Sequence, residues 1–124
     1  MKLQALVGGA AEVIGSEATL TEAAERMMDR EVDCLAVVEG REVAGIVTEY
    51  DIVSAVAADV DPDEATVSVW MTESPDTVPP TLTVREAAIW LLETGYRHLP
   101  VMDEGELLGV ISIKDVLWAL VESE

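Results

Sequence analysis

The chain has 124 residues, half of them apolar, with 25 acidic and 7 basic residues and a formal charge of -18. This length suits one ordinary domain, and the apolar fraction argues against disorder. Nucleic acid and an anionic membrane surface are excluded as expected partners, because both require a basic face. No apolar run approaches the roughly 18 residues that a membrane-spanning helix needs.

The charge and the single cysteine bear on where the protein works. Cys34 has no second cysteine with which to form an internal disulfide, so we expect a reducing cytoplasm. A high negative charge with only two lysines predicts that the folded chain repels itself. Salt at about 1 M would screen this repulsion, because it shortens the Debye length to about 3 Å. Two interpretations of the charge are open: the protein comes from a halophile with a salt-loaded cytoplasm, or it is a soluble acidic protein from any source. A melting temperature measured in low and in molar KCl separates these readings.

An internal repeat organises the sequence. When the chain is shifted by 64 positions, Thr19 lies over Thr83, and caps, turns and apolar stripes stay in phase. We therefore predict a first repeat over residues 1–58, a linker over residues 59–66 and a second repeat over residues 67–124. The acidic linker is expected to be a solvated connection. Each repeat is near the lower size limit for a core of its own, so the two are expected to pack together.

The first repeat is predicted to run β-α-β-β-α. An extended piece around residues 12–14 precedes a helix that opens with a capping box of Thr19 and Glu22. Strands follow over residues 35–38 and 43–47, joined by an acidic turn at Gly40. A last helix begins at Thr48. The predicted buried residues of the two helices are Ala23, Ala24, Met27 and Met28, and then Ile52, Val53 and Val56.

The second repeat has the same predicted order. After an extended piece around residues 77–79, a capping box of Thr83 and Glu86 opens a helix that Gly95 ends. Strands follow over residues 99–102 and 107–111, and the last helix begins at Ser112. Its predicted buried residues are Ala87, Ala88, Leu91 and Leu92, and then Val116, Leu117 and Leu120. The pattern predicts an α+β fold with helices covering one side of each sheet.

Both repeats carry a Gly-x-x-Thr/Ser-x-x-Asp pattern where the last strand enters the last helix. The first motif ends in Thr48 and Asp51, and the second ends in Ser112 and Asp115. These residues suit a helix cap, in which hydroxyl and carboxylate satisfy backbone N–H groups. They equally suit a nucleoside phosphate, because the helix N-terminus and hydroxyl can bind phosphate while the carboxylate accepts from ribose hydroxyls. Both interpretations are open at this point.

With these motifs and the Arg97-His98-Leu99-Pro100-Val101 segment, nearly the whole chain resembles a tandem pair of CBS domains, or Bateman module. The resemblance implies repeats that associate through their sheets with pseudo-two-fold symmetry. It also implies clefts that bind an adenosine derivative, which is AMP, ADP, ATP or S-adenosylmethionine, with magnesium if the ligand is ATP. It implies a homodimer that regulates an effector protein. The implied contacts are Asp51 and Asp115 to ribose, Thr48 and Ser112 to phosphate, and Ile14 and Val78 to the base.

The two motifs are not expected to bind equally. Arg97, His98 and Lys114 flank the second motif, whereas Asp33, Cys34 and Tyr50 take the matching places beside the first. Phosphate should therefore prefer the second repeat, and the resemblance implies Arg97 and His98 as phosphate contacts. Arg97 could instead be a surface ion-pair partner, and His98 a strand-start residue satisfied by the backbone. The three tryptophans are interpreted as core or interface anchors rather than as base-stacking platforms.

An enzyme is disfavoured. The chain has one histidine and one cysteine in different repeats, without a nucleophile–base–orienter set, a metal-ligand spacing or a P-loop. We expect a regulatory module that senses adenine nucleotides or another adenosine derivative and acts on a separate effector protein. The alternative is a ligand-independent dimerisation or interaction module in which both motifs are only helix caps.

Overall fold

The computed structural model describes residues 1–7 and 11–122, which form two compact units. The N-terminal unit is Glu12–Pro75, and the C-terminal unit combines Met1–Ala11 with Asp76–Glu124. Both units mix helices with a small sheet, so the α+β class is confirmed. The compact units and the sequence repeats have different boundaries, because the start of the chain belongs with the second repeat.

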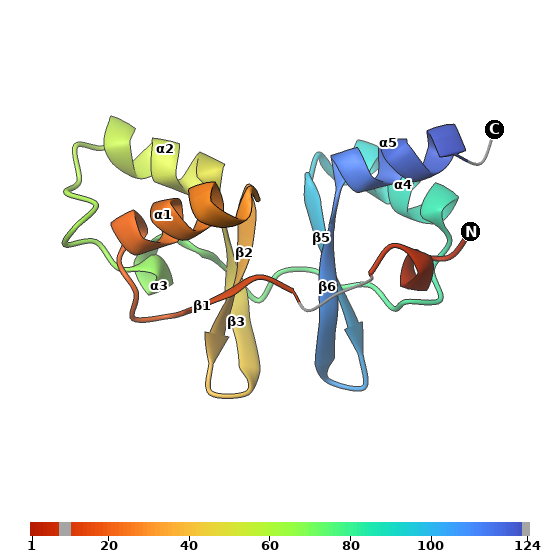
Figure 1. Ribbon diagram of the computed structural model, residues 1–124, viewed down its shortest axis with the longest axis horizontal. Coiled ribbons are helices and arrows are strands. Elements are labelled where there is room, and N and C mark those ends of the chain that lie inside the picture. The colour runs from red at the N-terminus through yellow and green to blue at the C-terminus, as the bar shows by residue number, and fades with distance from the viewer. Residues whose placement is uncertain (8–10, 123–124) are drawn as a thin grey trace. The chain divides into compact units, whose positions relative to one another are not determined.

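The N-terminal unit holds a four-stranded sheet in the order β1-β2-β3-β4. Strand β1 is parallel to β2, and the other neighbours are antiparallel. In Figure 1, α1 and α2 lie on one side of the β2–β3 hairpin. The elements are β1 (Val13–Gly15), α1 (Leu20–Arg30), β2 (Cys34–Glu39), β3 (Glu42–Thr48), α2 (Glu49–Ala57), α3 (Val67–Trp70) and β4 (Thr72–Glu73).

The C-terminal unit is built on the antiparallel hairpin of β5 and β6, with α4 and α5 on one side of it (Figure 1). Val78 takes the place of β1, forming an isolated parallel bridge with Val101. The elements are the 3-10 turn η1 (Leu3–Ala5), α4 (Val84–Thr94), β5 (His98–Asp103), β6 (Glu106–Ser112) and α5 (Ile113–Glu122).

The predicted local signals are confirmed at helix starts and turns. The hydroxyls of Thr19 and Thr83 each accept from the N–H of the glutamate three residues on, at 3.1 Å in both helices. Each glutamate accepts in return from the cap N–H, so both capping boxes are complete. Gly95 ends α4 with φ 78°, a left-handed conformation that glycine adopts without strain.

The predicted buried faces are only partly right. Met28 and Leu92 are 81% and 85% exposed, and Val53, Val56 and Leu117 are also exposed. Leu120 lies at 36% exposure, and Ile52 is half-buried. Ala55 and Ala119 are buried instead, beside the correctly predicted Val116. A helix on one layer buries only a stripe about 100° wide, and the small alanines occupy that stripe here. The larger neighbours face away from the unit.

The first seven residues, which we call the N-terminal arm, pack on the C-terminal unit. Leu3 is fully buried in the core of that unit, and its N–H donates to the Leu82 carbonyl at 2.9 Å. Lys2 forms an antiparallel bridge with Thr83, the cap of α4. The arm therefore belongs to the fold of a repeat that begins some sixty residues later in the sequence.

Residues 65–71, the linker arm, make the equivalent contacts in the N-terminal unit. Val67 is fully buried, and its N–H donates to the Ala18 carbonyl at 2.8 Å, 64 positions from the Leu3–Leu82 pair. Thr66 bridges to Thr19 as Lys2 bridges to Thr83. The last residues of the linker, which the sequence predicts to be solvated, therefore contact the start of α1. The Leu20 N–H also donates to the Ala65 carbonyl there.

Candidate functional site

The second motif lies where β6 enters α5. The Ser112 N–H donates to Asp115 Oδ2 at 2.9 Å, and the Asp115 N–H donates to Ser112 Oγ at 3.1 Å. These two bonds form a reciprocal cap, so the capping interpretation of the motif is correct. The cap uses neither the Ser112 hydroxyl proton nor Asp115 Oδ1. Both side-chain groups can therefore cap the helix and still contact a ligand.

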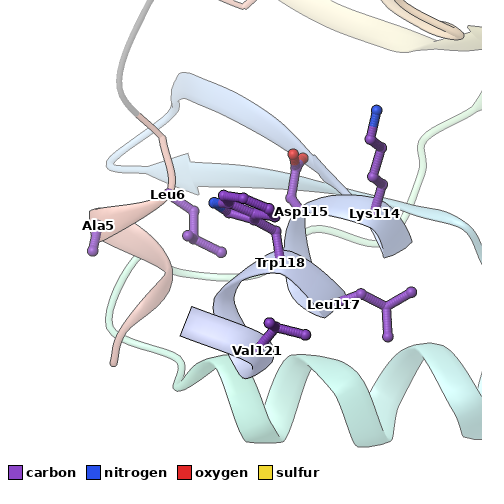
Figure 2. Close-up of a pocket in the computed structure, with 7 residues that line it drawn as sticks. All are labelled: Ala5, Leu6, Lys114, Asp115, Leu117, Trp118 and Val121. Atoms are coloured by element: carbon purple, nitrogen blue, oxygen red, sulfur yellow. The ribbon is translucent and has the colours of Figure 1, made fainter. Parts of the chain in front are cut away.

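Two of the predicted phosphate ligands flank this cap. His98 is the register partner of Ser112 across the β5–β6 ladder, and the Arg97 carbonyl accepts from the N–H of Ile113 at 3.0 Å. Lys114 and Asp115 are exposed in the first turn of α5, and Figure 2 shows them rising on the same side of the helix. The structure thus places the backbone of Arg97 and His98 beside the second motif and Lys114 in the same helical turn as Asp115.

The first motif also forms a reciprocal capping box, and its hydroxyl makes an additional contact with the carboxylate. Both the N–H and the hydroxyl of Thr48 donate to Asp51 Oδ2, at 2.8 and 3.3 Å. Asp51 is half-buried, and this burial raises the pKa of its carboxyl above the ordinary value, while the two bonds from Thr48 oppose the rise.

The surroundings of the first motif are acidic. Cys34 is the register partner of Thr48, and the Asp33 carbonyl accepts from the N–H of Glu49. Burial raises the pKa of the Cys34 thiol to about 12, with Asp33 and Asp51 adding to the effect. The neutral thiol and the neighbouring carboxylates offer no positive charge to a phosphate. The predicted asymmetry between the motifs therefore has a structural basis.

The glycines of the two motifs have a role that the sequence did not reveal. A Cβ atom at Gly45 would collide with the backbone oxygen of Thr72, and one at Gly109 would come within 2.9 Å of Val7 Cγ1. Each glycine therefore gives room to the arm that packs on its strand. The repeat itself held the signal, because Val7 and Met71 are 64 positions apart.

The two residues expected to contact the base lie inside their own units. Ile14 is 3% exposed and pairs with Val37 in the sheet, and Val78 is 8% exposed and pairs with Val101. Their contact with a base stays a prediction. Their burial leaves little of either side chain to face a ligand.

A hollow of about 550 Å³ lies beside the second motif, between the N-terminal arm and α5 (Figure 2). Asp115 belongs to its wall, so the hollow is continuous with the motif. The lining residues are Ala5, Leu6, Lys114, Asp115, Leu117, Trp118 and Val121. Its volume is in the range that small-molecule sites occupy.

Two other kinds of site receive no support from residues 1–7 and 11–122. Within these ranges, no group of three or more His, Cys, Asp or Glu side chains is arranged to hold a metal ion. The helices described there are too short or too polar to cross a membrane.

The chain is similar in sequence to known proteins. The chain is 34% identical over 113 residues to an uncharacterised 17.7 kDa protein of Acidianus ambivalens, covering 89% of this chain and 67% of that one. It is 34% identical over 102 residues to a CBS domain-containing protein of Arabidopsis thaliana, covering 81% of this chain. The chain spans only 18% of the Arabidopsis protein's length.

Solved structures of similar proteins have the same fold. A protein with CBS domains from Burkholderia ambifaria has a TM-score of 0.95 at 27% identity, covering 100% of this chain and 96% of that one. A CBS domain protein of Pyrobaculum aerophilum, solved in complex with AMP, has a TM-score of 0.85 at 27% identity, covering 98% and 99%.

A hexameric CBS-CP12 protein from bloom-forming cyanobacteria has a TM-score of 0.86 at 32% identity, covering 95% of this chain and 67% of that one. The CBS domain profile matches two tandem segments of this chain, residues 11–58 and 65–122. The repeat, the fold and these matches agree: the chain belongs to the CBS domain family and carries a tandem pair of the domains.

Proposed function

We propose that the protein is a regulatory module that binds an adenosine derivative, and that the second motif is its principal site. The observation that carries the proposal is the second motif itself. Ser112 and Asp115 keep a hydroxyl proton and a carboxylate oxygen outside the helix cap, beside Arg97, His98 and Lys114. A regulatory rather than a catalytic role agrees with the sequence, which offers no set of nucleophile, general base and orienting residue.

Each residue of the second motif has a proposed task. Asp115 Oδ1 accepts from a ribose hydroxyl, and the Ser112 hydroxyl donates to the phosphate at the start of α5, where the helix dipole also favours an anion. Lys114 and Arg97 supply the positive charge that a phosphate needs in a chain of formal charge -18, and His98 offers a ring N–H donor. Thr48 and Asp51 would do the same work at the first motif, but more weakly.

AMP is the first candidate ligand. A protein of formal charge -18 repels polyphosphates at low salt, and AMP carries less charge than ADP or ATP. The AMP-bound Pyrobaculum protein, 27% identical to this chain, supports the same choice. S-adenosylmethionine, or ATP with magnesium, would also avoid much of the repulsion. These two are the next candidates.

A thermal-shift experiment tests the proposal. The protein is melted in molar and low KCl with AMP, ADP, ATP, ATP with magnesium, or S-adenosylmethionine, and with inorganic phosphate as a control. A ligand at 100 times its Kd that binds only the folded chain adds about 2.7 kcal/mol of stability, and this raises the melting temperature. A response to AMP that exceeds the response to phosphate supports the proposal. No response to any of the five ligands in either salt contradicts it.

Exposed apolar side chains support a second role, in assembly. Leu92 on α4 and Met28 on α1 are each more than four-fifths exposed, and Val53 and Val56 on α2 are also exposed. Apolar surface of this kind commonly marks an interface. We propose that these helices meet a second copy in a homodimer, and that an effector protein reads the ligand-dependent state. Light scattering should give the mass of a dimer for the wild type and a lower mass for Leu92→Glu. A monomeric mass for both the wild type and the variant contradicts the dimer.

A further inference from the structure

A second hollow lies on the C-terminal unit, between the extended segment at Val78 and helix α4. Its volume is about 380 Å³, at the lower end of the range that small-molecule sites occupy. None of its lining residues belongs to either motif, and the lining holds an indole and three carboxylates but no lysine, arginine or histidine. The lining residues are Asp76, Thr77, Val78, Leu82, Glu86, Ile89, Trp90 and Glu93.

The repeat shows which chemistry fills the same place in the N-terminal unit. Arg26 of α1 stands 64 positions before Trp90. Val13 of β1 stands 64 positions before Thr77. Arg26 Nη1 donates to the Val13 carbonyl at 2.6 Å, so a guanidinium group spans the groove between β1 and α1. In the C-terminal unit an uncharged ring takes the place of that guanidinium, and a hollow lies beside the ring.

The acids around this groove are kept although the cations are not. In the N-terminal unit Glu12 Oε2 lies 4.0 Å from Arg30 Nε, and Asp76 takes the repeat position of Glu12. Thr94 takes the position of Arg30, and its hydroxyl donates to the Trp90 carbonyl at 2.8 Å. The C-terminal groove therefore keeps carboxylates without the guanidinium groups that accompany them in the other unit.

Three carboxylates are placed to receive a cation. Glu93 is exposed one turn after Trp90, and residues three apart share a helix face. Glu86 uses Oε1 in the capping box of α4, whose hydrogen bonds lower the pKa of this carboxyl, and its Oε2 stays outside the cap. Asp76 is hydrogen-bonded to the Tyr96 side chain, which holds the third carboxylate at the edge of the hollow.

The indole supplies the other part of a cation site. Trp90 is 38% exposed, so part of its side chain can contact a ligand. Tryptophan is the aromatic residue that attracts cations most strongly. A guanidinium group can stack on such a ring and also form a two-point hydrogen bond with a carboxylate, whereas an ammonium group lacks the planar shape for both contacts. The lining therefore favours guanidinium over ammonium.

We propose that this hollow is a binding site for a small molecule with a guanidinium group, which stacks on Trp90 and pairs with Glu93. The cation of the ligand takes the place that Arg26 occupies in the N-terminal unit. The site is independent of the adenosine proposal, because it shares no residue with the two motifs. It gives Trp90 a role beyond the core or interface anchor expected from the sequence.

Nuclear magnetic resonance tests the site by titration of the full chain with n-butylguanidinium. The titration is made in molar KCl, because about 1 M salt shortens the Debye length to about 3 Å and screens the general attraction of cations to a chain of charge -18. Saturable shifts of the α4 backbone amides, centred on Trp90, support the site, and their absence overturns it. n-Butylammonium should bind more weakly, and equal affinity contradicts a guanidinium site.

Substitutions of Trp90 test the comparison between the units. Trp90→Arg installs the residue of the N-terminal unit and should abolish the saturable shifts, since the chain then fills its own groove. Trp90→Leu should weaken binding about two- to fivefold, the value of a cation–π contact at an exposed site, and Trp90→Phe should recover part of the loss. Urea unfolding checks that each variant is folded. Wild-type affinity in both Trp90→Arg and Trp90→Leu overturns the proposal.

A matched pair of acid substitutions separates the site from net charge. Glu93→Gln should weaken n-butylguanidinium binding, whereas Asp29→Asn, which removes one charge at the same repeat position of the other unit, should bind as the wild type does. Equal losses in the two variants contradict the site. N-acetyl-arginine amide, which carries the same group between peptide bonds, should bind no more tightly than n-butylguanidinium. Much tighter binding of the amide would overturn the small-molecule assignment in favour of an arginine side chain of a protein partner.

Discussion

The two units share a backbone plan but differ in the chemistry around their motifs. Both close the last helix with a hydroxyl and an aspartate three residues apart. In the N-terminal unit the carboxylate is half-buried among acids and beside a buried thiol. In the C-terminal unit the carboxylate is exposed and follows Lys114, and β5, which begins at His98, lies beside the motif. The comparison teaches that capping fixes the shape of the motif, and we propose that its neighbours decide whether an anion can bind.

The units also differ in how the chain supplies their parts. The N-terminal unit is continuous, because its arm follows its own last helix. The C-terminal unit takes its arm from the start of the chain, across the whole intervening unit. The two arms nevertheless make matching backbone bonds. The two repeats therefore keep these backbone bonds although their arms are connected differently.

The largest expected effect comes from the N-terminal arm. Leu3→Ala removes a fully buried side chain from the C-terminal core and should lower the free energy of unfolding by about 2–5 kcal/mol. Urea denaturation followed by circular dichroism measures the loss. Gln4→Ala, at an exposed position of the same arm, is the control and should be close to neutral. Equal, small effects of the two substitutions would show that the arm does not stabilise the unit.

The motif glycines should differ in how they can be rescued. Gly109→Ala crowds the Val7 side chain and should lower the free energy of unfolding by about 1–3 kcal/mol. Val7→Ala in the same chain should recover much of that loss. Gly45→Ala meets a backbone oxygen, so Met71→Ala should not rescue it. A double-mutant cycle of unfolding free energies measures both couplings. Identical rescue in the two units would contradict this account of the glycines.

A smaller effect concerns pH. Because burial raises the pKa of Asp51 above its ordinary 3.8, the folded chain binds this proton more tightly than the unfolded chain. This carboxyl therefore lowers the stability as pH rises from 3.8 through the raised folded-state pKa, and the cost persists at neutral pH. Asp51→Asn should flatten that part of the stability curve. Asp115→Asn, at an exposed position, controls for the change in net charge. The same flattening in both variants would count against burial as the cause.

Local signals in the sequence were enough for much of the fold. Thr19 with Glu22 and Thr83 with Glu86 predicted both capping boxes, because a cap needs only residues three positions apart. The repeat predicted equivalent strands and the unequal surroundings of the two motifs. Gly95 predicted the end of its helix for the same local reason.

Properties set by tertiary packing were harder to predict. Met28 and Leu92 continue apolar helix patterns, yet they are exposed, since only the partner layer decides which part of a wide apolar face is buried. Ala55 and Ala119 were missed because a small side chain gives little hydrophobic signal. The packing of Leu3 on a repeat far along the sequence depends on topology that no local pattern encodes.

The most direct test of the account is a pair of AMP titrations by calorimetry on Asp51→Ala and Asp115→Ala, each compared with the wild type in molar KCl. If the neighbours of the motif govern binding, Asp115→Ala loses most of the affinity and Asp51→Ala loses much less. Equal losses in the two variants, or a larger loss for Asp51→Ala, would contradict the claim that the C-terminal unit holds the principal site.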